Sequence, residues 1–167
     1  MNHQSIKSNS MINSYLFPNK YKKWGWFIFI PTCILGFFTV ATDYAPEFLN
    51  TKVFAIYVDQ IMGETKAFSV ISNNILNEIL GILIIISGIL VGFSREQNED
   101  ELIAKIRLDS LVWATYLNYA ILLLAFVFLY DITFLWVMIL NMFTLLLFFI
   151  IRFNWQVNKL SKSLAND

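Results

Sequence analysis

The chain has 167 residues, of which 57% are hydrophobic and 14% charged, and its mean hydropathy is +0.61. Ordinary globular domains carry about 25% charged residues, and a domain of this size cannot bury so much apolar surface, so a soluble or disordered chain is excluded. The 12 basic and 12 acidic side chains cancel, which excludes capture of nucleic acid by net charge. The composition therefore predicts an integral membrane protein.

The chain opens with a polar segment and then reaches its first membrane span. Residues 1–19 are rich in Asn and Ser, and we expect a disordered cytoplasmic lead there. The remainder, 20–167, is expected to form a single membrane domain. A bilayer core of about 30 Å needs about 20 helical residues. Trp24–Val40 contains no charge and predicts a span over about 24–40. Its long apolar run and the absence of a small-residue cleavage site favour a retained anchor.

The next loop, about 41–74, contains apolar residues at helical spacing. Val53, Phe54, Tyr57, Val58 and Ile61 follow the positions i, i+1, i+4, i+5 and i+8, which predict one face of a short helix ending near Gly63. This helix is expected either on the outer membrane surface or packed over the outer end of the bundle. A second span follows at about 75–93.

One long apolar stretch must cross the membrane twice. Residues 111–151 contain a single charge, Asp131, and one helix of that length would extend about 60 Å, twice the hydrocarbon thickness. The stretch is therefore expected to turn at Asp131–Thr133, giving spans at about 111–130 and 133–151. The predicted fold is an all-α, polytopic membrane protein with an antiparallel four-helix transmembrane bundle.

The basic residues predict the orientation of these spans. An even number of spans puts both termini on one side, and by the positive-inside rule the side with more Lys and Arg faces the cytoplasm. Only Lys52 and Lys66 fall on the opposite side. We therefore expect a location in the inner, cytoplasmic membrane with both termini in the cytoplasm. The ten remaining basic residues are Lys7, Lys20, Lys22, Lys23, Arg95, Lys105, Arg107, Arg152, Lys159 and Lys162.

A charged segment between the second and third spans is the best candidate surface for a soluble partner. Residues 99–130 contain no Gly or Pro, so one helix can extend from the cytoplasm into the bilayer. A solvated helix end that only fixes the topology is the alternative interpretation, and the more common one. The candidate partner surface consists of Arg95, Glu99, Asp100, Glu101, Lys105 and Arg107.

Small and polar residues inside the spans are candidates for helix packing and for transport. Gly81, Gly88 and Gly92 share one stripe of the second span; packing within the chain is favoured over homodimerisation, which stays open. Glu78, near the outer end of that span, is favoured as a cap or interface contact over a proton- or ion-handling group.

The third and fourth spans carry a second set of polar candidates. Asn118 and Thr144 each lie 13 residues from Asp131, and Asn141 lies close to Thr144 in the sequence. Antiparallel neighbouring helices would place these residues at one depth, where side-chain hydrogen bonds can join the helices. This structural interpretation is favoured over a substrate-binding patch.

The residues that commonly carry chemistry are scarce. The single Cys33 and single His3 exclude a Cys/His metal site, an iron–sulfur cluster and paired-histidine haem ligation within one chain. A site made only of carboxylates stays open. We expect no catalytic residues and no cofactor.

Eight short segments stand out along the chain: Leu16–Trp26, Ile30-Pro31, Phe93–Glu96, Glu99–Glu101, Ile106–Leu111, Trp113-Ala114, Asn141–Thr144 and Ile151–Phe153. Together they resemble an uncharacterised family of small four-span inner-membrane proteins of the Bacteroidota. The resemblance covers nearly the whole chain except residues 1–14 and the outer loop. It implies a four-span topology and draws attention to the segment Arg95–Ser110 and to Asn141, but it implies no activity.

Two functions of different classes follow from these expectations. The first is a non-enzymatic membrane protein that senses or scaffolds through its cytoplasmic helical extension, with the lipid bilayer and a soluble cytoplasmic protein as partners. The alternative is a small transporter or channel component, acting as a homo-oligomer, that uses Glu78 and the Asn118, Asn141 and Thr144 layer. A membrane-embedded enzyme is the weakest interpretation.

Overall fold

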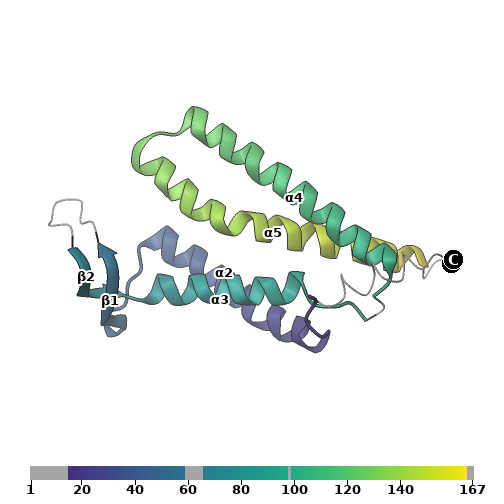
Figure 1. Ribbon diagram of the computed structural model, residues 1–167, viewed down its shortest axis with the longest axis horizontal. Helices are drawn as coiled ribbons and strands as arrows, with labels where there is room; N and C mark the ends of the chain where they lie inside the picture. The colour runs from purple at the N-terminus through teal and green to yellow at the C-terminus, as the bar shows by residue number, and fades with distance from the viewer. Residues whose placement is uncertain (1–14, 59–65, 98, 165–167) are drawn as a thin grey trace. The chain divides into compact units, whose positions relative to one another are not determined.

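The computed structural model describes residues 15–58, 66–97 and 99–164 and is mostly helical (Figure 1). Four α-helices, one short 3-10 turn and one pair of strands make up this part of the chain. In chain order they are α2 (Lys20–Thr42), η1 (Glu47–Leu49), β1 (Asn50–Val58), β2 (Lys66–Asn74), α3 (Leu76–Gly92), α4 (Glu101–Phe128) and α5 (Asp131–Leu164).

Three of these helices, α2, α4 and α5, are long and apolar enough to cross a membrane. The fourth, α3, is apolar but has only 17 residues. Large apolar side chains lie outward along them: Phe126, Phe128 and Ile132 are 60%, 70% and 68% exposed. Water would make this exposure costly, whereas lipid chains solvate such surfaces, so the helices indicate a membrane location.

The helices coincide with the four apolar segments predicted from the sequence, with different ends. The predicted extension of the third apolar segment is confirmed, because α4 runs without interruption from Glu101 to Phe128. Asp100 starts it by accepting a hydrogen bond from the Ile103 backbone N at 2.8 Å, an N-cap. The fourth segment is longer than predicted, since α5 continues beyond Ile151 to Leu164.

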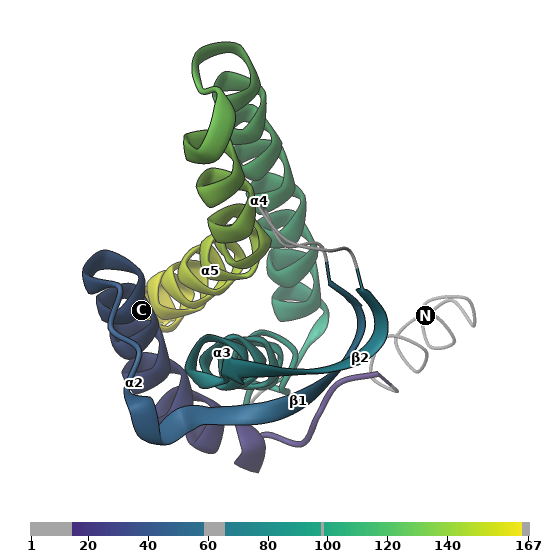
Figure 2. The ribbon, with the colours of Figure 1, turned by 90° about the vertical axis from the view of Figure 1, so that its left-hand side faces the viewer.

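The helix predicted in the loop 41–74 is wrong, because this segment forms an antiparallel β-hairpin. Phe54 pairs with Val70 and Val53 with Ile71. β-Branched and aromatic residues favour extended backbone, and the apolar residues of β1 occupy both faces of the strand, which also satisfies helical spacing. The antiparallel pairing of β1 with β2 shows that this segment is extended and not helical (Figure 2). Ile61 and Gly63, at the predicted helix end, lie outside the described residues.

The chain divides into two compact units. One unit is Ile30–Leu83, and the other combines Met1–Phe29 with Ile84–Asp167. In the first, Asn74 organises the base of the hairpin. Its side-chain amide donates to the Pro46 backbone O at 2.7 Å and to Asn50 Oδ1 at 2.8 Å, and its own Oδ1 accepts from the Leu76 backbone N at 3.2 Å. One side chain thus joins η1, β1 and α3.

In the second unit, α4 and α5 form an antiparallel helical hairpin (Figure 1), and glycines allow α3 to approach α5. A Cβ at Gly92 would lie 2.6 Å from Phe149 Cε1, and one at Gly88 would meet Leu146 and, at 3.1 Å, Phe29 Cε2. Phe149 is fully buried. The two glycines therefore pack within the chain, the interpretation favoured from the sequence.

We predict that Gly92→Ala destabilises the protein by about 1–3 kcal/mol, because the added methyl group displaces the buried Phe149 ring. Thermal unfolding in detergent, followed by helical circular dichroism, measures the change. Ala120→Val is the control, since it adds bulk at an exposed position of α4. An unfolding temperature for Gly92→Ala equal to that of the wild type would contradict this packing.

Candidate functional site

The segment before α2 is bound to the loop between α3 and α4. The Phe17 backbone N donates to Phe93 O at 3.0 Å, and the Arg95 backbone N donates to Phe17 O at 2.9 Å. The Asn19 side-chain amide donates to Arg95 O at 2.7 Å. Residues 15–19, which the sequence assigned to the disordered lead, therefore have a defined conformation; residues 1–14 lie outside the described residues.

A buried ion pair between Glu99 and Arg107 also holds the loop between α3 and α4 in place. The Arg107 guanidinium contacts both carboxylate oxygens of Glu99, at 2.5 and 3.1 Å, and also donates to Ser94 O at 3.2 Å. The side chains of Arg107 and Glu99 are only 8% and 9% exposed. The guanidinium carbon lies 4.8 Å from the centre of the Phe153 ring of α5. One side chain therefore connects the loop, α4 and α5.

Two of the six residues predicted to form the candidate partner surface have buried side chains. Glu99 and Arg107 bind each other inside the protein, so they are not available to a partner. The other four members, Arg95, Asp100, Glu101 and Lys105, are exposed. The sequence does contain a signal for the burial of Arg107, because this residue lies on one helical stripe with other buried residues, Ile103, Ser110, Ala114 and Asn118.

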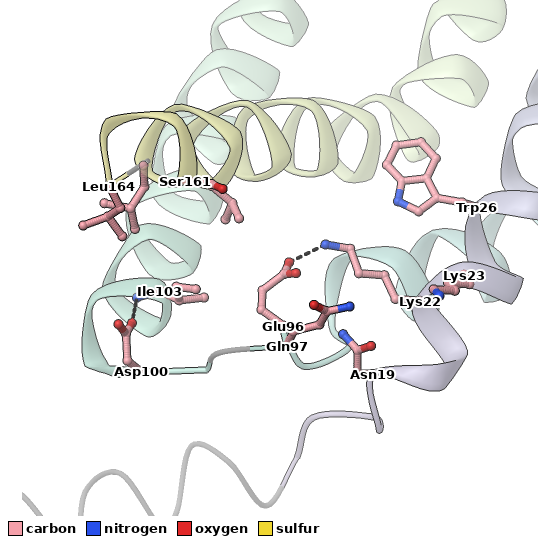
Figure 3. A pocket seen from close by; sticks show the side chains of 12 residues that line it. Asn19, Lys22, Lys23, Trp26, Glu96, Gln97, Asp100, Ile103, Ser161 and Leu164 are labelled. Carbon is pink, nitrogen blue, oxygen red and sulfur yellow. Dashed lines mark hydrogen bonds and ion pairs between the residues drawn. The ribbon is translucent and has the colours of Figure 1, made fainter. Parts of the chain in front are cut away.

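A cavity of about 580 Å³ lies beside this loop. Lys22 of α2 and Glu96 of the loop form an ion pair at its wall, with side chains that are each 14% exposed. Figure 3 shows the two side chains reaching toward each other, with Ser161 and Leu164 contributed by α5. The lining also includes exposed Lys23 and Asp100. The cavity thus offers charges of both signs next to apolar side chains, a combination suited to binding a peptide or another amphipathic group.

The sequence pattern does not predict that residues of α2 and α5 line this cavity. In the sequence, Lys22 and Lys23 count only among the basic residues that set the orientation. The pairing of Lys22 with Glu96 joins residues 74 positions apart, and no local pattern predicts such a contact. The continuation of α5 to Leu164 was also missed, and it supplies one wall of the cavity.

The polar residues of α4 and α5 lie together, as counting from the turn predicted. Asn118 and Asn141 exchange two amide hydrogen bonds at 3.2 and 3.1 Å, and the Thr144 hydroxyl lies 2.7 Å from Asn118 Oδ1. Asn118 is 4% exposed. Because these groups bond to one another, the layer joins α4 to α5.

The remaining sequence candidates lie elsewhere. Gly81 is in the middle of α3, and Glu78 is in its first turn, where its Oε1 accepts a hydrogen bond from the Asn73 side-chain amide at 2.8 Å. Glu78 is exposed, and this contact joins the end of β2 to the start of α3. Within the described ranges, no group of three or more His, Cys, Asp or Glu side chains is placed to hold a metal ion.

Comparison with known proteins adds nothing to this geometry: no family model, curated protein or solved structure matches the chain. The resemblance to the four-span family therefore stays a prediction.

We predict that Asn118→Leu lowers the free energy of unfolding by about 1–2 kcal/mol, because it removes its hydrogen bonds to Asn141 and Thr144 in an apolar environment. Thermal unfolding in detergent measures the loss. Asn158→Leu makes the same chemical change at an exposed position of α5, where the expected change is within about 0.5 kcal/mol. Equal effects of the two substitutions would show that the layer does not hold α4 to α5.

Proposed function

We propose that the protein crosses the inner membrane four times, keeps both termini in the cytoplasm, and acts as a non-enzymatic scaffold or sensor. In this proposal a soluble cytoplasmic protein docks at the cavity between the start of α2, the α3–α4 loop and the end of α5. The observation that carries the proposal is that α4 and α5 are longer than a bilayer requires, and their additional polar turns border this cavity.

The helix lengths support this placement. At 1.5 Å per residue, the 34 residues of α5 extend about 51 Å, against a hydrocarbon core of about 30 Å. The polar turns that remain belong to the side of the membrane on which the predicted topology places ten of the twelve basic residues. By the positive-inside rule, this side faces the cytoplasm. The 17 residues of α3 extend about 26 Å, enough to cross if the bilayer thins slightly.

The charges around the cavity support docking of a protein surface. Lys22 and Glu96 neutralise each other, which leaves the exposed Lys23 and Asp100 to contact a partner. Apolar side chains of α5, including Leu160 and Leu164, lie beside them. An apolar area with a charged rim is typical of sites for protein partners.

Transport is less well supported by the geometry. The Asn118, Asn141 and Thr144 groups bond to one another, so they offer little to a passing substrate. Glu78 is exposed and hydrogen-bonded to Asn73. We therefore rank the scaffold or sensor function above the transporter or channel component.

Site-specific photocrosslinking in cells tests the proposal. A photoreactive amino acid at Ser161, an exposed residue of the cavity lining, is expected to capture one soluble protein in reproducible, near-stoichiometric yield. The same residue placed at Lys162, outside the lining, is expected to capture much less. Mass spectrometry of the crosslinked product identifies the partner.

Two matched charge reversals connect that capture to the cavity. Lys23→Glu, in the lining, should reduce the crosslinked product at least fivefold, because it inverts the charge offered to the partner. Lys52→Glu makes the same change at an exposed position of β1 that does not line the cavity, and it should leave the product unchanged. Crosslinks to further copies of the chain alone, or equal loss with both variants, would contradict the proposed docking.

A further inference from the structure

A second groove lies on the flank of the α4–α5 hairpin, with Lys159 in its lining and Arg152 one helical turn before the lining residue Gln156. Both cations rest on aromatic rings. The Arg152 guanidinium carbon of α5 is 4.5 Å from the centre of the Trp113 ring of α4. The Lys159 ammonium nitrogen is 6.0 Å from the centre of the Trp155 ring. Stacking of this kind leaves the edge of the guanidinium free to donate hydrogen bonds to an anion.

Among the described residues, Arg152 and Lys159 form no ion pair with a carboxylate, whereas Lys22 and Arg107 each have one. The Nε of Arg152 is buried and has no hydrogen-bond partner in the described part of the chain. The flank therefore carries two positive charges that no carboxylate of the described residues neutralises.

Among the described residues, the lining of the groove beside these cations contains no carboxylate. A cavity of about 450 Å³ is lined by Ile106 of α4 and by Trp155, Gln156, Lys159, Leu160 and Ser163 of α5. Arg152, Gln156, Lys159 and Ser163 are spaced by four, three and four residues, so they follow one stripe of α5. Arg152 is the member of this stripe that lies nearest to the apolar part of α5. In the lining, the apolar side chains of Ile106, Trp155 and Leu160 accompany the polar ones.

The position of Arg152 along the chain places it at the edge of a bilayer. Residues 132–151 contain no charge, and Arg152 is the first charged residue after them. Trp113 lies close to the corresponding boundary of α4, where the apolar residues begin at Leu111. Tryptophan and basic residues at such boundaries lie at the level of lipid headgroups. An unpaired guanidinium at this level is next to the phosphates of the membrane.

We propose that this groove binds the headgroup of an anionic phospholipid in the cytoplasmic leaflet. The phosphodiester would accept hydrogen bonds from Arg152 and charge from Lys159, while Trp113 and Ile106 contact the upper part of the lipid chains. This inference rests on the membrane placement proposed above, but it does not depend on a protein partner. It adds a lipid preference, determined by the α4–α5 flank, to the proposed function.

Native mass spectrometry of the full-length protein in neutral detergent tests this preference. With phosphatidylglycerol and phosphatidylcholine at equal concentration, the wild type should retain phosphatidylglycerol. Lys159→Gln and Arg152→Gln should each weaken its binding about fivefold, the effect of one basic residue near an anionic lipid surface. Lys162→Gln, with the same charge change on the same helix but outside the groove, should bind as the wild type does. Circular dichroism verifies that each variant is folded.

Other outcomes would overturn the proposal. Equal retention of the two lipids, or an equal effect of Lys159→Gln and Lys162→Gln, would show that no specific groove exists. Displacement of the lipid by millimolar glycerol phosphate would show that the site binds a soluble anion instead. If Arg152→Gln is not folded, Arg152→Lys replaces it; this variant keeps the charge, loses the planar stacking on Trp113, and should weaken binding by a smaller factor. Photocrosslinking at Ser161 does not depend on this groove, so the two proposals fail independently.

Discussion

The buried pair of Arg107 and Glu99 is the interaction on which the α3–α4 loop and the residues around the cavity depend. Two charges with side chains 8% and 9% exposed are tolerated because they pair in a bidentate geometry, and the guanidinium also donates to Ser94 O. Removing one partner of such a pair typically costs about 3–5 kcal/mol, since the other is left buried and unpaired. The pair therefore fixes the path of the α3–α4 loop.

The loop in turn positions the groups that surround the cavity. Glu99 Oε2 accepts a hydrogen bond from the Glu96 backbone N at 2.8 Å, and Glu96 pairs with Lys22 of α2. On its other side, Arg107 rests on Phe153, which stacks with Phe149, whose ring lies against Gly92. A continuous series of contacts thus connects the polar end to the apolar packing of α3 and α5. A partner bound at the cavity would act on this series directly.

The sequence predicted the features that depend on local pattern. Four apolar segments, the turn near Asp131 and the shared depth of Asn118 and Thr144 follow from hydropathy and from counting residues along helices. The hairpin of β1 and β2 was missed because Val53, Phe54, Tyr57 and Val58 fit helical spacing, while the strand partner lies in a separate segment. The roles of Arg107 and Lys22 depend on contacts between distant segments. From the sequence alone, Lys22 counts only among the basic residues that set the orientation and Arg107 among the candidate partner surface, although the stripe from Ile103 to Asn118 marks Arg107 as facing inward.

A double-mutant cycle on Arg107 and Glu99 tests this account most directly. The free energy of unfolding in detergent would be compared for Arg107→Leu, Glu99→Leu and the double variant. We predict that each single substitution costs about 3–5 kcal/mol and that the double variant costs less than their sum by at least about 2 kcal/mol, because it leaves no unpaired buried charge. Additive losses would show that the two residues do not depend on each other, and would contradict the central role given to this pair.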